Sequence, residues 1–226
     1  LKETVETRGE NLVRGLNHLL EDLEAGQGSL KIRQTAPDTF EVGKNIAVSK
    51  GKVVFQNRLM QLMQYDPSTE MQFARPLLIV PPWINKYYIL DLQPKNSFIK
   101  WATDQGHTVY VISWVNPHEE LADASFEDYM QDGPLAALAA IEKDCGVGEV
   151  NAVGYCLGGT LLASTLAYMA ATGDDRIKSA TYFASLVDFS EPGELGVFID
   201  EEHIKMVEEM MEKKGYLDGN QMATTF

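Results

Sequence analysis

The chain has 226 residues, of which 45% are apolar, so it can bury the core of one ordinary domain or of one domain with an appendage. Its net charge of −14 argues against a nucleic-acid partner, because phosphate backbones are bound by clusters of Lys and Arg. We expect neither a membrane span nor a signal peptide, since every apolar run is shorter than the roughly 18 residues that a span needs.

The first predicted element is an amphipathic helix at residues 9–24, where Leu and Val recur at helical spacing and Gly26 follows as a stop signal. Residues 40–65 contain two β-rich stretches on either side of SKGK (49–52). This pattern predicts a hairpin with its turn at SKGK. We treat residues 1–40 as a separate N-terminal helical segment.

Strands and helices then alternate along the chain. A continuous apolar run at residues 75–82 predicts a strand that is buried on both faces, and residues 107–114 predict another buried strand. Residues 148–156 and 177–189 predict a third and a fourth strand of the same parallel sheet. Helical patterns between them predict helices at residues 91–106, 126–144 and 158–173. The second of these helices should break near Gly133 and Pro134. The alternation predicts an α/β fold with a mostly parallel sheet, whose core we place at residues 41–187.

After Asp188 the sequence becomes acidic and rich in Met, with one amphipathic helix that carries Ile204, Val207, Met210 and Met211. We interpret residues 188–226 as the beginning of a cap over the carboxyl edge of the sheet. The chain starts at Leu1 and stops at Phe226 without a helix stop signal. We therefore expect a fragment that lacks the C-terminal part of a longer protein.

The strongest chemical signal is Gly-Tyr-Cys-Leu-Gly at residues 154–158, between a predicted strand and a predicted helix. This is the context of a nucleophile elbow, with cysteine where serine is common. The turn strains the backbone of the nucleophile, and glycines flank it because larger side chains would collide. The helix N-terminus stabilises a thiolate. Cys156 is therefore the candidate nucleophile, and the backbone N–H of Leu157 is a candidate oxyanion donor.

A second oxyanion donor in such folds comes from the loop after an earlier strand. Here that loop is PPWINKYY (81–88), and the backbone near Trp83 and Ile84 is the candidate. Asn85 and Lys86 are candidates for substrate binding, with Lys86 near a phosphate group of the substrate. The alternative, which stays open, is that Asn85 stabilises the turn and Lys86 is solvated.

Other residues have simpler interpretations. A cysteine in a folded chain is usually a small hydrophobe, and we interpret Cys145 as that or as a helix-end residue. Trp114 and Asn116 end a predicted strand, and we assign them a structural role. A dinucleotide site is not indicated, because G-x-G-x-x-G is absent here. Two cysteines fit a reducing compartment, and their spacing suggests no metal site.

Five segments together resemble the polyhydroxyalkanoate synthases: FEVGKNIAVSKGKVVFQN (40–57), PPWINKYYILDLQPKNS (81–97), GHTVYVISWVNP (106–117), NAVGYCLGGTLL (151–162) and LVDFSEPGELGVFIDE (186–201). The resemblance runs from about residue 9 to the end. It implies an α/β-hydrolase-fold acyltransferase that polymerises (R)-3-hydroxyacyl-CoA into polyester and releases coenzyme A (CoA). The G-Y-C-L-G-G box is similar to the class I branch, which implies short-chain monomers such as 3-hydroxybutyryl-CoA, and the family nucleophile falls on Cys156.

The resemblance also implies the setting of the reaction. The CoA thioester is a substrate, and no separate cofactor or metal is expected. The implied partners are the growing polyester chain, a second copy in a homodimer, and granule-associated proteins. The implied location is the bacterial cytoplasm, at the surface of polyester granules.

Family members use a Cys-His-Asp triad whose Asp and His follow the cysteine in the chain. Three of the four histidines precede it and are excluded by that order: His18, His107 and His118. His203 follows it, but within the acidic helix, where we interpret it as a solvated residue. Asp188 ends the fourth predicted strand, and we assign it a structural role. We therefore expect the catalytic Asp and His beyond Phe226, and this fragment alone to be inactive.

Two rival functions stay open. One is a cysteine-dependent hydrolase or thioesterase of the same fold, which would release free acid. The other is a truncated, non-catalytic interaction module. For the N-terminal helix at Leu12–Leu23 we favour packing within the protein, with granule or partner binding as the alternative.

Overall fold

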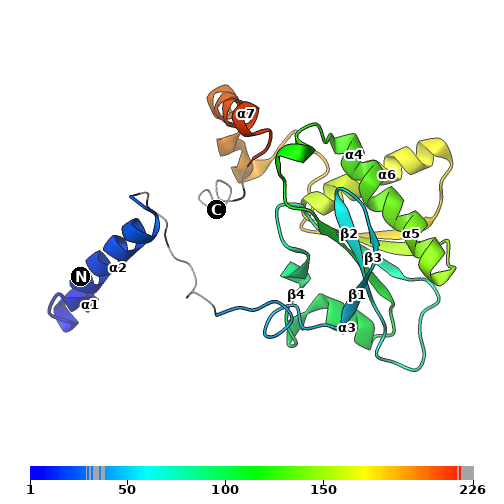
Figure 1. Cartoon of the computed structure of the whole chain (residues 1–226), viewed down its shortest axis with the longest axis horizontal. Helices are drawn as coiled ribbons and strands as arrows, with labels where there is room; N and C mark the ends of the chain where they lie inside the picture. Colours follow the sequence, from blue (N-terminus) through cyan, green and yellow to red (C-terminus); the bar gives the residue numbers. More distant parts are fainter. Residues whose placement is uncertain (29, 31, 33–35, 37–38, 218, 220–226) are drawn as a thin grey trace. The chain divides into compact units, whose positions relative to one another are not determined.

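The computed structural model describes residues 1–28, 30, 32, 36, 39–217 and 219 (Figure 1). It divides into two units, Leu1–Glu41 and Val42–Phe226. The first unit contains helices α1 (Lys2–Glu6) and α2 (Glu10–Ala25), and α2 agrees with the helix predicted at 9–24. Within this unit the apolar face of α2 is exposed at Leu12, Val13, Leu16, Leu19 and Leu20.

The second unit is built on a six-stranded sheet in the order β1-β2-β6-β3-β7-β8. Its strands are β1 (Gly51–Gln56), β2 (Met60–Tyr65), β3 (Leu77–Val80), β6 (Val109–Trp114), β7 (Val150–Tyr155) and β8 (Ile177–Phe183). The two pairs made by β2 are antiparallel, and the three pairs among β6, β3, β7 and β8 are parallel. The predicted α/β fold with a mostly parallel sheet is confirmed.

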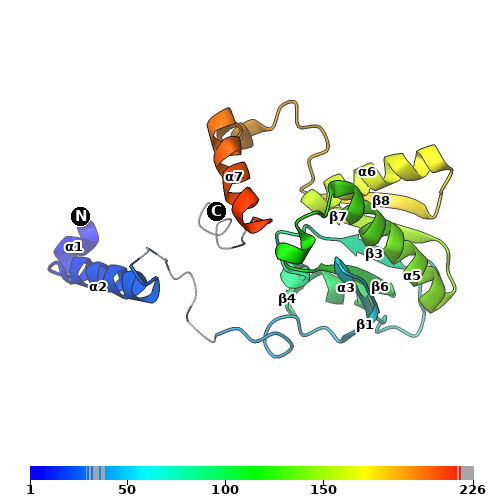
Figure 2. The same ribbon diagram turned by 45° about the horizontal axis from the view of Figure 1, so that its top comes forward.

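Helices cover both faces of this sheet (Figures 1 and 2). They are α3 (Phe98–Asp104) on one face, and α4 (Phe126–Met130), α5 (Ala136–Cys145) and α6 (Leu157–Thr172) on the other. After β8 come the short helix η4 (Gly193–Phe198) and α7 (Glu201–Lys214). Two more short helices, η1 (Tyr87–Leu90) and η2 (Glu119–Leu121), follow β3 and β6.

The central strand β3 shows why continuous apolar runs mark the middle of the sheet. All four of its residues are buried. Leu78 and Val80 belong to the core beneath α5 and α6, whereas Leu77 and Ile79 belong to the core beneath α3. Because successive side chains of a strand point to opposite faces, a strand that is covered on both sides needs an apolar residue at every position.

The helix predicted at 126–144 is broken where the sequence indicated. A π-helical turn (Gln131–Leu135) separates α4 from α5, and Gly133 has φ −97° and ψ −105°. A Cβ atom at Gly133 would lie 2.5 Å from the indole of Trp114. The break therefore makes room for a large side chain at the end of β6.

The prediction of a hairpin with its turn at SKGK is wrong, because the two strands that pair, β1 and β2, both follow Lys50. Gly51 lies inside β1, where a Cβ atom would come within 2.6 Å of the Tyr65 ring. The actual turn lies at Asn57, whose side-chain oxygen accepts hydrogen bonds of 2.9 Å from the N–H groups of Leu59 and Met60. An asparagine that caps its own turn replaces the glycine turn that we expected.

The prediction of one helix over residues 91–106 is also wrong in its first half. That part forms a small hairpin of β4 (Asp91–Gln93) and β5 (Asn96–Ser97), and α3 begins only at Phe98. The Ser97 hydroxyl accepts a hydrogen bond from the Lys100 N–H and so caps the helix. Gly106 follows the helix at φ +94°.

The last strand is shorter than predicted. β8 ends at Phe183 rather than at residue 189, because Ala184 adopts φ +45° and turns the chain out of the sheet. Asp188 therefore lies in the loop beyond the strand. The amphipathic helix expected after it is present as α7. Residues 220–226 of the expected cap lie outside the described residues.

Candidate active site

Cys156 stands between β7 and α6, as the strand–turn–helix pattern predicts, and it is half-buried. It is the N-cap of α6 and has φ +53° and ψ −128°, a conformation that L-residues rarely adopt. Its N–H donates to the Phe183 carbonyl, and its carbonyl accepts from the N–H groups of Gly159 and Thr160. Hydrogen bonds to the neighbouring strand and to the following helix hold this strained residue in place.

The flanking glycines are required by close backbone approach. A Cβ atom at Gly158 would lie 2.1 Å from the carbonyl oxygen of Val80, at the end of β3. A Cβ atom at Gly154 would lie 2.4 Å from Cα of Gly159. The first turn of α6 is thereby pressed against the ends of β3 and β7, and the cysteine occupies the carboxyl edge of the sheet.

Sequence reasoning missed the residues that support this turn from the other side. A Cβ atom at Gly159 would come within 1.9 Å of Oγ of Ser185. The Ser185 hydroxyl hydrogen-bonds to the carbonyl of Phe183 at 3.1 Å, and the Thr160 hydroxyl donates to the carbonyl of Leu186 at 2.7 Å. The only signal in the sequence is a small polar residue after a strand, which is common in any loop.

The predicted oxyanion donors lie at the start of α6 and in the loop after β3. Leu157 is the first residue of α6, and a first helical N–H has no partner inside its helix. No backbone acceptor for it occurs in the described part of the chain. Trp83 and Ile84 follow β3, which is the strand hydrogen-bonded to β7. The role of these residues as donors stays a prediction.

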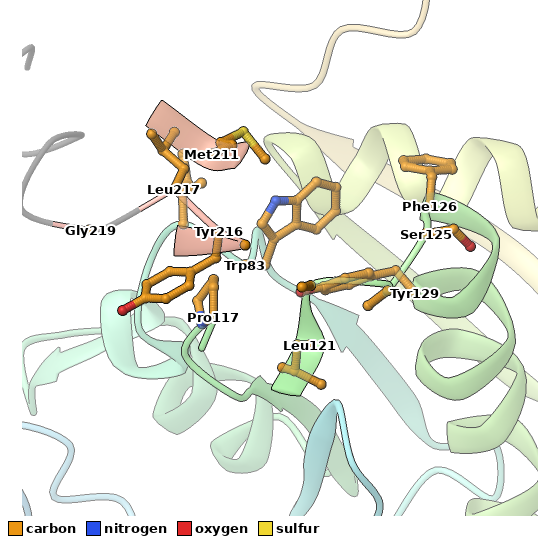
Figure 3. Close-up of a pocket in the computed structure, with 14 residues that line it drawn as sticks. Trp83, Pro117, Leu121, Ser125, Phe126, Tyr129, Met211, Tyr216, Leu217 and Gly219 are labelled. Carbon is orange, nitrogen blue, oxygen red and sulfur yellow. The ribbon is translucent and has the colours of Figure 1, made fainter. Parts of the chain in front are cut away.

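The Trp83 side chain belongs to an aromatic cluster with Trp114, Phe126 and Tyr129 (Figure 3). Its ring centroid lies 6.4, 6.2 and 5.3 Å from those of the other three, in that order. The indole N–H of Trp114 donates to the carbonyl of Pro81 at 2.7 Å, which agrees with the structural role assigned to Trp114. This cluster links the candidate oxyanion loop to the end of β6 and to α4.

Two adjoining pockets share Trp83 and Ile84. The apolar pocket, of about 390 Å³, is bounded by the segment after β6, by α4 and by the end of α7. It is lined chiefly by Trp83, Leu121, Phe126, Tyr129, Met211 and Tyr216. The polar pocket, of about 480 Å³, adds Asn85, Lys86 and Asn116. Cys156 lines neither pocket, and both pockets include Trp83 and Ile84 of the loop after β3.

Asn85 closes a turn, as one of its interpretations predicted, and Lys86 hydrogen-bonds to a residue of the loop after β6. The backbone N–H of Asn85 donates to the carbonyl of Pro82, which closes a turn in the loop. The Lys86 ammonium donates to the side-chain oxygen of Asn116 at 2.7 Å, and both residues line the polar pocket. A cation held at the rim of a pocket is suited to a phosphate group, but substrate binding here stays a prediction.

The histidines have partners away from the cysteine. His107 stacks on Phe73 with ring centroids 4.5 Å apart, before the start of β6 and so at the opposite edge of the sheet. His203 is exposed on α7 and its ring contacts the carboxylate of Asp200, the N-cap of that helix. A hydrogen bond from the His203 N–H lowers the pKa of Asp200. These positions agree with the exclusion of His107 as the catalytic base and with the interpretation of His203 as a solvated helix residue.

Asp188 accepts a hydrogen bond from the Ser190 N–H at 2.9 Å, which lowers the pKa of its carboxyl group. This turn-forming contact agrees with the structural role assigned to it. Cys145 is an exposed helix-end residue, as one of its two interpretations predicted. In the part of the chain that the structure describes, no cluster of His, Cys, Asp or Glu could hold a metal ion, and no helix is long and apolar enough to cross a membrane.

A mostly parallel sheet with a strained cysteine between its fifth strand and the following helix defines the class as α/β hydrolase. Solved structures with this general fold include esterase B of Lactobacillus rhamnosis, at 14% identity and TM-score 0.47 over 77% of this chain and 60% of that one. Another is EstE7 from a metagenome library, at 12% identity and TM-score 0.46 over 75% of this chain and 52% of that one.

Sequence comparison then shows which known proteins the chain resembles. Residues 1–102 match the family described as the poly-beta-hydroxybutyrate polymerase (PhaC) N-terminus. The whole chain is 54% identical to the poly(3-hydroxyalkanoate) polymerase subunit PhaC of Rhizobium meliloti and 55% identical to the poly(3-hydroxyalkanoate) polymerase of Methylorubrum extorquens. It is 44% identical, over 90% of its length, to the PhaC subunit of Cupriavidus necator, of which it covers 34%. The resemblance to the polyhydroxyalkanoate synthases is confirmed.

The chain spans 37% of the length of each of the first two relatives. Activities of those complete proteins therefore concern a polypeptide that is well over twice as long.

Proposed function

We propose that the full-length protein containing this chain polymerises (R)-3-hydroxyacyl-CoA, with short-chain monomers such as 3-hydroxybutyryl-CoA, into polyester. The observation that carries the proposal is Cys156, a half-buried residue at φ +53° where β7 turns into α6. A cysteine at such a strand–helix turn is suited to attack a thioester and to carry the acyl group as a covalent intermediate. The names of the similar proteins support a poly(3-hydroxyalkanoate) product, and the CoA thioester and the short chain length come from the family resemblance.

The mechanism follows from thiol chemistry. The Cys156 thiolate attacks the thioester carbonyl, and the N–H of Leu157 with a donor at Trp83 or Ile84 stabilises the oxyanion. The bond from the acyl carbon to the CoA sulfur breaks, CoA leaves with a proton, and the acyl group remains on Cys156. A hydroxyl group of a second acyl unit or of the growing chain then attacks the acyl-enzyme. An ester forms, and the cysteine sulfur is released.

Both steps need a base to accept and return protons. None of the histidines in the described part of the chain hydrogen-bonds to Cys156, and His107 and His203 have other partners. We propose that the His and Asp of the triad come from sequence outside this chain, and that the chain by itself does not turn over substrate. The Lys86 ammonium in the polar pocket is proposed to face a CoA phosphate.

The test is incubation of the full-length protein with 3-hydroxybutyryl-CoA, with CoA release and insoluble polyester both measured. Cys156→Ala should lower CoA release by about a thousandfold or more. Cys145→Ala is the matched control, because it removes the other thiol from an exposed helix end, and it should leave the rate unchanged. Undiminished CoA release by Cys156→Ala would refute the assignment.

The same experiment separates the rivals. CoA release with free 3-hydroxybutyrate and no polymer would identify a hydrolase or thioesterase. A folded protein that yields neither CoA nor polymer would identify an interaction module. From the family resemblance we further propose a homodimer that acts in the cytoplasm at polyester granules, with granule-associated proteins as partners.

A further inference from the structure

We infer that the apolar pocket beside the aromatic cluster binds a segment of the neutral polyester product, several acyl units long, as the chain leaves the cysteine. This inference rests on the proposed function and concerns a pocket on the loop after β3, whose Pro81 backbone would lie 2.7 Å from a Cβ atom at Gly158 of the elbow. The pocket is bounded by three separate parts of the second unit: the loop after β3, the segment from Pro117 to Tyr129, and the end of α7. Figure 3 shows Trp83 between Met211 of α7 and Tyr129 of α4.

The size of the pocket excludes a single short acyl unit as its natural occupant. Its volume is about 390 Å³. A four-carbon hydroxyacyl unit fills on the order of 100 Å³ at the packing density of organic solids. One unit would leave most of the apolar surface unfilled, whereas three or four units in succession would cover it. The volume also lies within the usual range for small-molecule sites.

The charge of the lining points to the same occupant. None of the described residues that line the apolar pocket is Asp, Glu, Lys, Arg or His, although the chain carries a net charge of −14. Burial raises the pKa of Tyr129, so its phenol stays neutral and keeps its proton. An uncharged polyester fits this lining, and the Tyr129 hydroxyl is a donor suited to an ester carbonyl. The phosphates of CoA fit the adjoining polar pocket with Lys86 instead.

The position of the pocket connects it to the reaction. Trp83 contributes its backbone to the candidate oxyanion loop and its indole to the pocket wall. Cys156 does not line the pocket, so an acyl group bound to its sulfur lies outside the pocket when it is first attached.

The test measures binding without turnover, in full-length protein carrying Cys156→Ala. The probes are the methyl ester of a linear 3-hydroxybutyrate tetramer and methyl 3-hydroxybutyrate, both uncharged, with affinity read by calorimetry. The tetramer should bind at least about tenfold more tightly than the monomer. Adding Phe126→Ala should weaken tetramer binding by about tenfold, because it removes one wall of the pocket.

Two further variants keep the result interpretable. Leu121→Trp fills the pocket instead of emptying it, and should also weaken tetramer binding if the fold is intact by circular dichroism. Phe73→Ala removes a phenylalanine of similar exposure, 56% against 48% for Phe126, beside His107 at the other edge of the sheet. Tetramer binding should be unchanged in that control.

Three results of the binding experiment would overturn the inference. Equal affinity for monomer and tetramer, or tetramer binding that neither pocket variant weakens, would overturn the inference. Binding of free CoA that Phe126→Ala weakens would assign the pocket to CoA and would also overturn it. Failure of the proposed function is seen separately, as absent CoA release in protein with its cysteine intact, and does not alter the binding result.

Discussion

The strained backbone of Cys156 predicts an unusual order of stability between two substitutions. Its φ of +53° and ψ of −128° lie outside the regions that L-residues favour, and such strain costs about 1–3 kcal/mol. Alanine retains a Cβ atom and should retain the strain, whereas glycine relieves it. Glycine also gives the unfolded chain more freedom, which lowers stability by about 0.4–1 kcal/mol. The balance favours Cys156→Gly over Cys156→Ala by about 1 kcal/mol.

The measurement is urea unfolding of the full-length protein, followed by tryptophan fluorescence. The Gly variant should have the higher midpoint with an unchanged slope, so that the difference reports stability alone. Cys145 supplies the matched pair, because it is the last residue of α5 with no such strain. There the ordinary order should hold, with Gly less stable than Ala by up to about 1 kcal/mol.

If Cys156→Ala proved more stable than Cys156→Gly, the backbone at this position would be relaxed, and the elbow geometry would lose its physical basis. The same order of stability at both cysteines would have the same meaning. A reversed order at Cys156 alone is the result that supports the reasoning.

Two other glycine pairs test the packing around the site in the full-length protein. Gly158→Ala should destabilise the protein by about 3 kcal/mol or more, because the added Cβ would lie 2.1 Å from a backbone oxygen. Gly148→Ala should be nearly neutral, because its Cβ would meet only the end of a flexible side chain at 3.5 Å. Similar unfolding midpoints for the two variants would contradict this reasoning. Gly215→Ala, with its Cβ 2.8 Å from the side chain of Ala122, should loosen the end of α7 and expose the 119–125 segment to proteolysis. Gly173→Ala has a similar φ of +75° but open space, so equal cleavage of the two variants would show that only backbone strain matters.

The pattern of local residues was enough to predict most elements of the second unit. The apolar runs at β3, β6 and β7 identified strands that are buried on both faces, because that environment demands apolar residues without interruption. The pentapeptide around Cys156 identified the elbow for a similar reason, since tight backbone approach demands glycine within two residues of the cysteine. Both signals act over short stretches of chain.

The errors arose where one residue type has two physical uses. Gly51 suggested a turn, but it is needed because the Tyr65 ring lies over β1. Residues 91–97 suggested part of a helix, but the buried carboxylate of Asp91 accepts hydrogen bonds from the hydroxyls of Ser49 and Ser97 and holds a small hairpin. In both cases the deciding partner is distant in the sequence or belongs to a different element.

The sequence by itself determined the α/β class, the position of the elbow and the family that the chain resembles, because each depends on contiguous residues. Only the tertiary structure decided which side chains form the two pockets beside the elbow. The apolar pocket joins Trp83, Leu121, Phe126 and Met211, which come from three separate stretches of the chain. No local pattern specifies such a wall, since it exists only when the ends of β3 and β6 and the last turn of α7 are brought together by folding.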